Sequence, residues 1–352
     1  MKRFNSIFVL AFAAVVATAF VLPTLQASAI SSAALSIVPK KNYTIEPGKS
    51  IDDRLTIRNL DDTETLELSL RIVDFTFTDD GGAPKLMMAE DAPQTTWSLK
   101  PFIKVPKTVS IPPRGSQTVD MSVAIPEGHG AGSYYSAIVY SSGASDAGNV
   151  GLSASGVTLV FTDIPGEVKQ DLKLEKFGAY KTAVGGEAAK YVIMTTQEPL
   201  NMAYTLKNGG NVTEAPVGSI TLKNMFGREY TINDVNPNKS LALIDQKRTF
   251  ISCIEQKSEK VDFNGTRAEA QACTSAGLMP GYYSASLNLF YGQNGNMTQE
   301  IAGKASFWYL PWWFILVSII IILAVAYGIW RGVSAARAKL HGPRFKKSTR
   351  RK

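Results

Sequence analysis

The sequence is poor in the residues on which catalysis and metal binding depend. Among 352 residues there are only two histidines and two cysteines. It has no HExxH, paired-cysteine or Gly-x-Ser-x-Gly motif, and Asp79-Asp80-Gly81 lacks the spaced acids of a calcium loop. His129 lies alone in a glycine-rich string, where we expect it to be solvated. We therefore expect no enzyme, no metal site and no cofactor, although a carboxylate pair for glycoside cleavage would need no local motif.

Charge is also sparse, at 19% of residues, and it is unevenly distributed. The net charge of +7 arises from two basic residues at the N-terminus and nine beyond residue 330. The stretch between them has 26 basic and 30 acidic residues. This balance excludes a basic nucleic-acid-binding surface over the central part of the chain, so we expect no DNA or RNA partner for it.

The N-terminal residues have the order of a secretory signal. Lys2 and Arg3 precede an apolar run over residues 7–22, and the small residues Ala27-Ser28-Ala29 follow. This order predicts a signal peptide over residues 1–29, with an uncleaved N-terminal anchor as the alternative. No cysteine lies near the cleavage site, so a lipid-anchored lipoprotein is not expected.

A second apolar run predicts a transmembrane helix over residues 310–330. Leu310–Ile329 contains 20 residues without a charge. At about 1.5 Å per residue, this length spans a hydrocarbon core of roughly 30 Å. The tryptophans expected at the membrane interfaces are Trp308, Trp312, Trp313 and Trp330. The sequence therefore predicts a single-pass membrane protein, with the lipid bilayer as its first partner.

The segment after this helix, residues 331–352, is a basic tail without an acidic residue. Positive residues stay on the cytoplasmic side, which predicts a cytoplasmic C-terminus and an ectodomain (residues 30–309) outside the cell membrane. We expect the tail to fix this orientation; binding to anionic headgroups, a cytoplasmic partner or RNA is the alternative. Its basic residues are Arg331, Arg337, Lys339, Arg344, Lys346, Lys347, Arg350, Arg351 and Lys352. The string Leu-Pro-Trp-Trp at 310–313 is not a sortase site, so the protein is expected to stay in the membrane.

Alternating hydrophobicity dominates the ectodomain. Apolar and polar residues alternate over 66–72 and again over 119–125, and Phe75 and Phe77 continue in the opposite phase, which suggests a bulge near Val73-Asp74. Many short strands separated by turn residues are typical of antiparallel sandwiches. The predicted fold class is an all-β ectodomain of two tandem immunoglobulin-like β-sandwiches plus one C-terminal transmembrane α-helix.

An internal repeat supports two domains. The segment at 55–59 is echoed at 204–208, an offset of 149, and Tyr-Tyr-Ser-Ala at 134–137 recurs at 282–285, an offset of 148. With Pro165-Gly166 as the junction, the domains cover residues 30–165 and 166–306. The aromatic residues at 134, 135, 140, 282, 283, 290 and 291 are expected to pack in the two cores.

The two cysteines, Cys253 and Cys273, both lie in the predicted ectodomain. An exported pair is most simply a disulfide, and closing a loop of about 20 residues is worth roughly 3 kcal/mol. The enclosed polar segment, 253–273, is interpreted as an insertion of the second domain with a helix-forming end at Thr266–Ala272. It is the first candidate contact surface, and a tolerated surface insertion is the alternative.

The order of parts, together with several turns and strands, resembles one known family. The matching stretches are Ser36-Ile-Val-Pro39, Leu55-Thr-Ile-Arg-Asn59, Val109-Ser-Ile-Pro-Pro-Arg-Gly115, Val119–Pro126, Gly132-Ser-Tyr-Tyr135, Asn236-Pro237 and Pro280-Gly-Tyr-Tyr283. In these the chain is similar to the WxL-interacting proteins of Gram-positive cell surfaces. The resemblance implies a first domain of a peptidoglycan-binding type and a second domain that holds wall-associated proteins. The cysteine-closed insertion departs from the family pattern.

These observations together predict a non-enzymatic surface protein. It would tether cell-wall material, a surface protein, or both to the membrane through its tandem domains. The alternative is an accessory or sensor subunit of an envelope complex that signals through the basic cytoplasmic tail.

Overall fold

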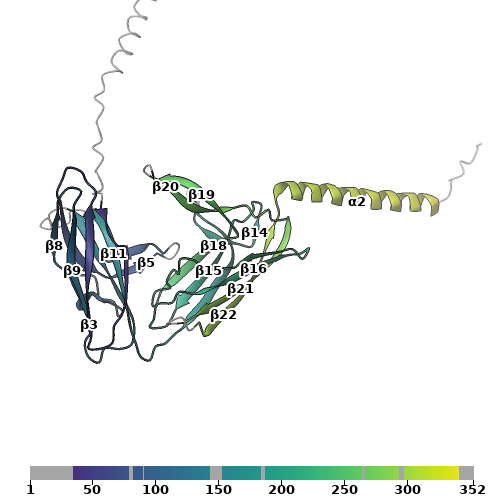
Figure 1. Cartoon of the computed structure of the whole chain (residues 1–352). Coiled ribbons are helices and arrows are strands. Elements are labelled where there is room, and N and C mark those ends of the chain that lie inside the picture. Colours follow the sequence, from purple (N-terminus) through teal and green to yellow (C-terminus); the bar gives the residue numbers. More distant parts are fainter. Residues whose placement is uncertain are drawn as a thin grey trace, which may run out of the picture.

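The computed structural model describes residues 35–78, 82–89, 91–142, 153–183, 187–263, 266–292 and 297–340. These residues form two β-sandwiches followed by a single helix, which confirms the predicted fold class (Figure 1). The predicted signal peptide and the turn at 79–81 lie outside the described residues.

The first sandwich (domain 1) has two sheets. In spatial order, sheet 1A contains β1 (Leu35–Ser36), β3 (Ser50–Asn59), β9 (Ser116–Ala124) and β7 (Ile103–Lys104). Sheet 1B contains β2 (Lys40–Thr44), β11 (Ser153–Ile164), β10 (Gly132–Ser142), β4 (Leu66–Val73) and β8 (Thr108–Ile111). A hairpin of β5 (Phe75–Phe77) with β6 (Pro84–Leu86) and the 3-10 turn η1 (Lys100–Phe102) complete the domain.

The second sandwich (domain 2) repeats this plan. Sheet 2A contains β13 (Lys190–Val192), β12 (Leu172–Lys181), β15 (Asn201–Asn208) and β18 (Lys247–Cys253). Sheet 2B contains β14 (Met194–Thr195), β22 (Gln299–Tyr309), β21 (Gly281–Tyr291), β16 (Val217–Asn224) and β17 (Glu229–Ile232). The hairpin of β19 (Glu255–Phe263) and β20 (Thr266–Thr274) projects from it.

The two five-stranded sheets share their strand pairing. The four-stranded sheets differ at one edge: β15, which corresponds to β3, pairs with β12 and β18, and β13 adds an edge strand beyond β12, whereas in domain 1 β7 adds an edge strand beyond β9. In each five-stranded sheet one short strand pairs in parallel with the last strand, β2 with β11 and β14 with β22, while the other pairs are antiparallel. In both domains the preceding segment of chain belongs to the opposite sheet, so the first strand crosses from one sheet to the other. This crossing joins the two layers at one edge.

Each domain also ends one central strand with the same buried asparagine. Asn59 donates from Nδ2 to the carbonyl oxygens of Glu64 (2.8 Å) and Ile111 (3.2 Å). Asn208 donates likewise to Val212 (2.7 Å) and Ala242 (3.0 Å). In both domains the side-chain amide thus bonds a carbonyl oxygen of the loop that follows the strand and one of a neighbouring segment, and it fixes that loop.

A tyrosine in each domain sets the register of the repeat. The hydroxyl of Tyr134 donates to the carbonyl oxygen of Gly130, and that of Tyr283 donates to Met279, four residues upstream in both cases. Tyr283 is therefore the counterpart of Tyr134, at the same offset of 149 as the asparagine pair. The offset of 148 expected for the tyrosines from sequence is wrong by one residue.

Three further expectations are also wrong. The chain leaves sheet 1B at Val73 and starts the β5–β6 hairpin at Phe75, so no bulge carries one strand through Asp74. The expected helical end of the insertion, Thr266–Ala272, lies in β20, which pairs with β19 along its whole length. Tyr282 and Phe290 are exposed rather than packed in a core, because they are on the outward face of β21.

A third apolar cluster joins the two domains. Val73, Phe75 and Tyr135 on the outer side of sheet 1B are buried together with Leu243 of domain 2. Backbone and amide groups add hydrogen bonds across the junction, including the Ser133 amide to the Asn211 carbonyl oxygen (2.9 Å) and Asn211 Nδ2 to Ala131 (3.0 Å). Buried apolar contact combined with hydrogen bonds fixes one domain against the other.

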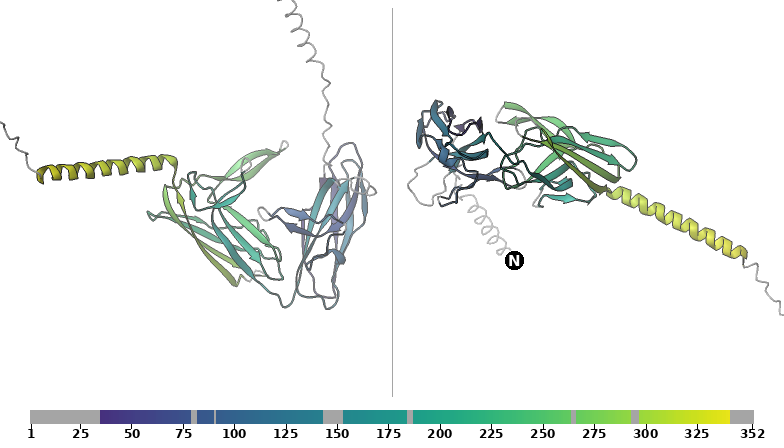
Figure 2. Two further views of the ribbon diagram at one scale, coloured as in Figure 1. Left: turned by 180° about the vertical axis from the view of Figure 1, so that it is seen from behind. Right: turned by 90° about the horizontal axis from the view of Figure 1, so that it is seen from below.

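The C-terminal helix α2 (Trp312–Leu340) follows β22 after only two residues, Leu310 and Pro311. Its section Trp312–Arg337 is long and apolar enough to cross a membrane, and none of its most apolar window is buried in the protein. The helix extends away from domain 2 at the end of that domain where β22 finishes (Figure 2). The described residues therefore include one helix that fits a single-pass membrane anchor.

Candidate functional site

The outer face of sheet 1A is an exposed polar surface. Alternation along β3 buries Leu55 and Ile57 and turns Asp52, Arg54 and Thr56 outward. Along β9 the same alternation exposes Thr118 and Asp120, opposite Thr56 and Arg54. Strand pairing therefore sets charged and hydroxyl side chains in rows on one flat surface.

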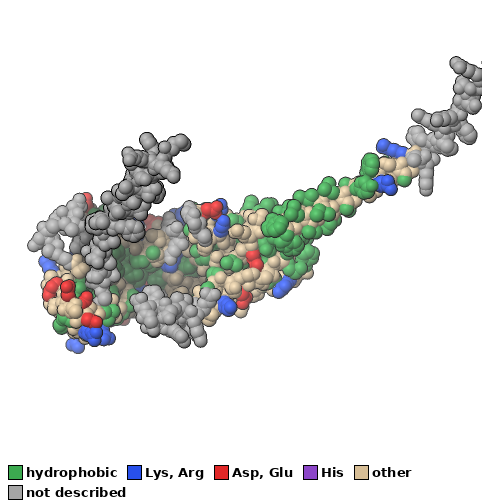
Figure 3. Space-filling model, turned by 90° about the horizontal axis from the view of Figure 1, so that it is seen from above, with side chains coloured by type: hydrophobic (Ala, Val, Ile, Leu, Met, Phe, Trp, Pro, Cys, Tyr) green, Lys and Arg blue, Asp and Glu red, His purple; other side chains and the backbone are tan. Residues whose placement is uncertain are grey.

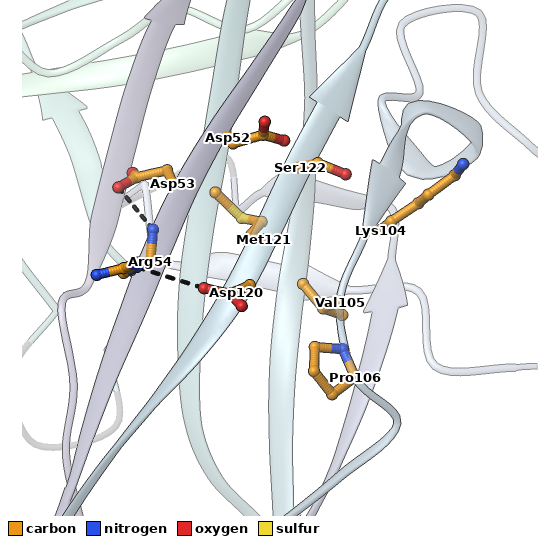
Figure 4. Close-up of a pocket in the computed structure, with 9 residues that line it drawn as sticks. All are labelled: Asp52, Asp53, Arg54, Lys104, Val105, Pro106, Asp120, Met121 and Ser122. Atoms are coloured by element: carbon orange, nitrogen blue, oxygen red, sulfur yellow. Dashed lines mark hydrogen bonds and ion pairs between the residues drawn. The ribbon is translucent and has the colours of Figure 1, made fainter.

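A groove of about 850 Å³ opens on this face (Figure 4). Three strands build it, β3, β9 and β7, because β7 pairs with β9 through only Ile103 and Lys104 and then turns away at Pro106. Its lining residues are Asp52, Asp53, Arg54, Lys104, Val105, Pro106, Asp120, Met121 and Ser122. The lining therefore combines charged side chains of both signs with the apolar side chains of Val105, Pro106 and Met121.

The charges in this groove differ in how firmly they are held. Arg54 Nε lies 3.4 Å from Asp120 Oδ1, and both side chains are largely exposed, so this ion pair is weak and open to exchange with a ligand. Asp53 instead accepts hydrogen bonds from Lys41 Nζ (2.7 Å) and the Tyr43 hydroxyl. These two donors lower the pKa of Asp53 to about 2. Asp53 therefore stays ionised and supports the wall of the groove, whereas Arg54 and Asp120 are available for binding.

A cross-strand threonine pair extends the polar surface beyond the groove. Thr56 and Thr118 face each other across β3 and β9 with their hydroxyl oxygens 3.4 Å apart, and both side chains are exposed. Domain 2 has the same pair: Thr205 and Thr249 face each other across β15 and β18 at 2.9 Å. The threonine pair therefore belongs to the repeated plan of the sandwich.

In domain 2 this surface is covered by the chain itself. The Tyr191 hydroxyl lies 2.7 Å from Thr205 Oγ1, and Tyr191 stacks edge-on against Tyr180. Thr205 is consequently buried, and Ala203, on the same face of β15, is buried too. The Tyr191 hydroxyl thus contacts the threonine pair of domain 2, whereas the equivalent pair of domain 1 is exposed.

The predicted disulfide is present. Cys253 and Cys273 are bonded, with their Cα atoms 5.1 Å apart, at the base of the β19–β20 hairpin. The insertion is thus an antiparallel ribbon tied to the end of β18, far along the chain from the groove of domain 1. The sequence identified its position and its closure.

The predicted membrane-interface residues lie at the two ends of the apolar part of α2. Trp308 is the penultimate residue of β22, Trp312 and Trp313 begin the helix, and Trp330 lies beside Tyr327 near its other end. Of the basic tail, Arg331 and Arg337 lie in exposed turns of α2, and the backbone of Lys339 is in its last turn. Arg344, Lys346, Lys347, Arg350, Arg351 and Lys352 lie outside the described residues.

His129 is more constrained than expected. Its ring packs edge-on between Phe102 (centroids 4.9 Å apart) and Tyr134 (4.6 Å). It is half-buried rather than solvated, and its role is to close the loop before β10. Within the described part of the chain, no group of three or more His, Cys, Asp or Glu side chains is placed to hold a metal ion.

Sequence reasoning missed the groove and the threonine pairs. The charged residues at alternating positions, Asp52, Arg54 and Asp120, were the sequence signal of an exposed sheet face. Which face would stay open depended on whether another part of the chain covered it, and the Tyr191 contact is not apparent from the order of residues.

No family model and no curated protein matches the chain. Among solved structures it is similar to the class 5 fimbriae chaperone CfaA, at 12% identity and a TM-score of 0.32, over 77% of this chain and 98% of that one. It is also similar to the Escherichia coli chaperone DraB (11%, 0.32, 79% and 97%) and the Pseudomonas aeruginosa chaperone CupB2 (9%, 0.28, 75% and 96%). At these identities and TM-scores the likeness carries no argument about function.

Proposed function

We propose that the protein is a non-enzymatic, membrane-anchored envelope protein whose first domain binds cell-wall glycan on the outer face of sheet 1A. The observation that carries this proposal is the contrast between two equivalent surfaces. The face is open in domain 1, whereas in domain 2 the chain covers it with a tyrosine hydroxyl. A hydroxyl-rich ligand fits the open one, because the same threonine pair accepts a hydroxyl in the covered one.

The charges of the groove fit the other groups of peptidoglycan. Arg54 and Lys104 offer cations to carboxylates of the sugars and stem peptides, while Asp52 and Asp120 offer acceptors to hydroxyl, amide and ammonium groups. Because these side chains are exposed and weakly paired, a ligand need not break a strong internal contact to reach them. This chemistry supports the peptidoglycan-binding role implied by the resemblance to WxL-interacting proteins.

The anchor completes the proposal. Helix α2 holds the tandem domains on the outer surface of the cell membrane, and the basic residues from Arg331 onward hold its C-terminus in the cytoplasm. A site fixed to the membrane meets the wall at high local concentration, so a tether can work with modest affinity. The hairpin β19–β20 is the proposed contact for a wall-associated protein.

Co-sedimentation with protein-free sacculi tests the glycan site. Full-length protein in detergent micelles is expected to pellet in a saturable way, and pelleting should weaken as salt screens the exposed charges of the groove. The double substitution Arg54→Ser and Asp120→Ser should weaken pelleting about tenfold, which corresponds to about 1.4 kcal/mol. A matched control is Lys223→Ser with Glu229→Ser, which removes an exposed ion pair of 2.9 Å from domain 2. Equal pelleting of both variants would contradict the site, and no pelleting of the unsubstituted protein would contradict wall binding.

A further inference from the structure

A group of exposed apolar side chains surrounds the point where domain 2 meets the helix. Ile193 is 81% exposed and Phe226 is 66% exposed, values far from those of a sandwich core. We call the group Ile193, Met194, Met225, Phe226, Tyr282 and Trp308 the apolar collar. Hydrophobic side chains gather at this end of domain 2 and continue onto α2 (Figure 3).

The collar is continuous, although its residues come from four segments of the chain. The Met225 amide donates to the Tyr282 carbonyl oxygen (2.9 Å), and the Tyr282 ring lies 5.3 Å from that of Trp308. The Trp308 amide donates in turn to the Ile193 carbonyl oxygen (2.9 Å), and Leu310 to Thr195 (2.9 Å). Strand pairing therefore fixes the collar to the residues that lead directly into the helix.

The length of the helix determines how close the apolar collar lies to the membrane. Counting back from Arg331, which must remain at the far interface, about 20 residues at 1.5 Å each cross the hydrocarbon core and end near Leu310. The described chain has no spacer there, because β22 ends at Tyr309. Residues hydrogen-bonded to Trp308 and Leu310 are therefore brought into the headgroup layer.

Equivalent positions in the other domain supply a second argument. Tyr282 faces Trp308 across the last strand pair of domain 2, and the corresponding pair in domain 1 is Ser133 with Asp163, one residue before the end of the strands in both cases. Ser133 and Asp163 are polar and hydrogen-bonded to each other, and Ser133 also bonds domain 2. The equivalent residue pair is thus polar in domain 1, where it contacts domain 2, and aromatic in domain 2, where it lies beside the start of α2.

We propose that the apolar collar of domain 2 is immersed in the headgroup layer of the membrane that α2 crosses. This inference rests on the proposed anchoring by α2. Immersed Trp and Tyr rings match the amphipathic preference of the interface, and an exposed apolar surface of this kind is otherwise unusual for a soluble domain. Domain 2 then sits directly on the bilayer.

Spin-label accessibility tests the proposal with full-length protein in nanodiscs of equimolar phosphatidylcholine and phosphatidylglycerol. Single labels are attached at Phe226→Cys, in the collar, and at Phe290→Cys, an exposed site near the other end of β21. A third label at Ile320→Cys reports on the helix. The collar label is expected to be several-fold less accessible to a water-soluble nickel chelate than the Phe290 label, and more accessible to oxygen.

The outcomes separate the collar from the anchor. If the Phe226 label is open to nickel while the Ile320 label is shielded, the collar proposal is overturned and the anchor stands. Nickel access to both would overturn the anchor, and the collar with it. Shielding of the Phe226 label from nickel and oxygen together would mean that protein, such as a second copy of the chain, covers the collar instead of lipid.

Discussion

The two sandwiches have one plan and different surroundings. Both end a central strand on a buried asparagine, both fix a loop with a tyrosine hydroxyl, and both place a glycine with positive φ at the start of the following strand: Gly132 (φ 147°) and Gly281 (φ 141°). The space beside each glycine is filled by the next layer. A Cβ at Gly132 would lie 2.6 Å from the Asn211 carbonyl oxygen of domain 2, and one at Gly281 would lie 2.9 Å from Met225 of the collar. The comparison shows that the shared strands specify the sandwich fold. The residues beside the first residue of β10 and of β21 differ, and they determine which surface contacts that end of each sandwich.

The largest expected effect comes from the shared asparagines. Asn208→Ala should destabilise domain 2 by about 4 kcal/mol, because the buried Val212 carbonyl oxygen and the Gly210 amide lose their partner and the Ala242 carbonyl oxygen keeps only the Glu214 amide. Asn59→Ala should cost a similar amount in domain 1 alone. Hydrogen exchange on peptides of each domain measures the two effects separately. Since the loop after Asn208 carries Asn211, only Asn208→Ala should also speed exchange at Ser133; an unchanged rate there would break the comparison.

The disulfide is a difference between the domains, and its removal should affect one of them. Replacing Cys253 and Cys273 by serine releases a loop of 20 residues and should cost domain 2 about 3 kcal/mol. Denaturant unfolding of the full chain, followed by exchange in each domain, is the measurement. Comparable destabilisation of domain 1 would show that the two domains unfold as one unit.

The junction between the domains carries a buried carboxyl with an altered affinity for protons. Burial, with a smaller contribution from the nearby Asp163 carboxyl, raises the pKa of Glu214 to about 7. The folded state therefore binds this proton more tightly than the unfolded state. The stabilisation is full below the usual glutamate pKa of about 4.5 and is lost as pH rises toward 7, by on the order of 2–3 kcal/mol.

Glu214→Gln should remove this pH dependence and leave the protein more stable than the unsubstituted chain above pH 7. Thermal unfolding between pH 5 and pH 8 is the measurement. The control is Glu229→Gln, an exposed carboxyl paired with Lys223. If both variants follow the pH profile of the parent, the buried carboxyl does not control the junction.

The smallest effect concerns the threonine pairs. Tyr191→Phe should cost domain 2 about 1 kcal/mol, because the hydroxyl on Thr205 is lost at a buried site. Thr56→Val should change the stability of domain 1 by less than about 0.5 kcal/mol, since its partner is replaced by water. Urea unfolding measures both, and equal costs would mean that the face in domain 1 is not open.

Much of this fold could be predicted from sequence because its determinants are local. Alternation at 66–72 and 119–125, the uncharged run before Arg331 and the isolated cysteine pair each reflect one physical requirement along a short stretch. The failures depended on distant contacts. Residues 266–272 have the composition of a helix but form a strand beside β19, and Tyr282 is exposed because it lies on the outward face of β21. Predicting which sheet face stays exposed would have required knowing which surface Tyr191 covers.

The junction of β22 and α2 also has a mechanical consequence. In the proposed tether, a force applied through domain 1 would enter domain 2 at the end where β12 begins and leave at the opposite end, where β22 runs into the helix after two residues. Such a pull runs along β22, at right angles to its hydrogen bonds with β21, which continue over all eleven residues of the strand. The hydrogen bonds between β21 and β22 would all be loaded in shear at the same time. They would not be opened one after another from one end of the strand pair. A sandwich mounted in this way resists extension best along the direction from the start of β12 to α2.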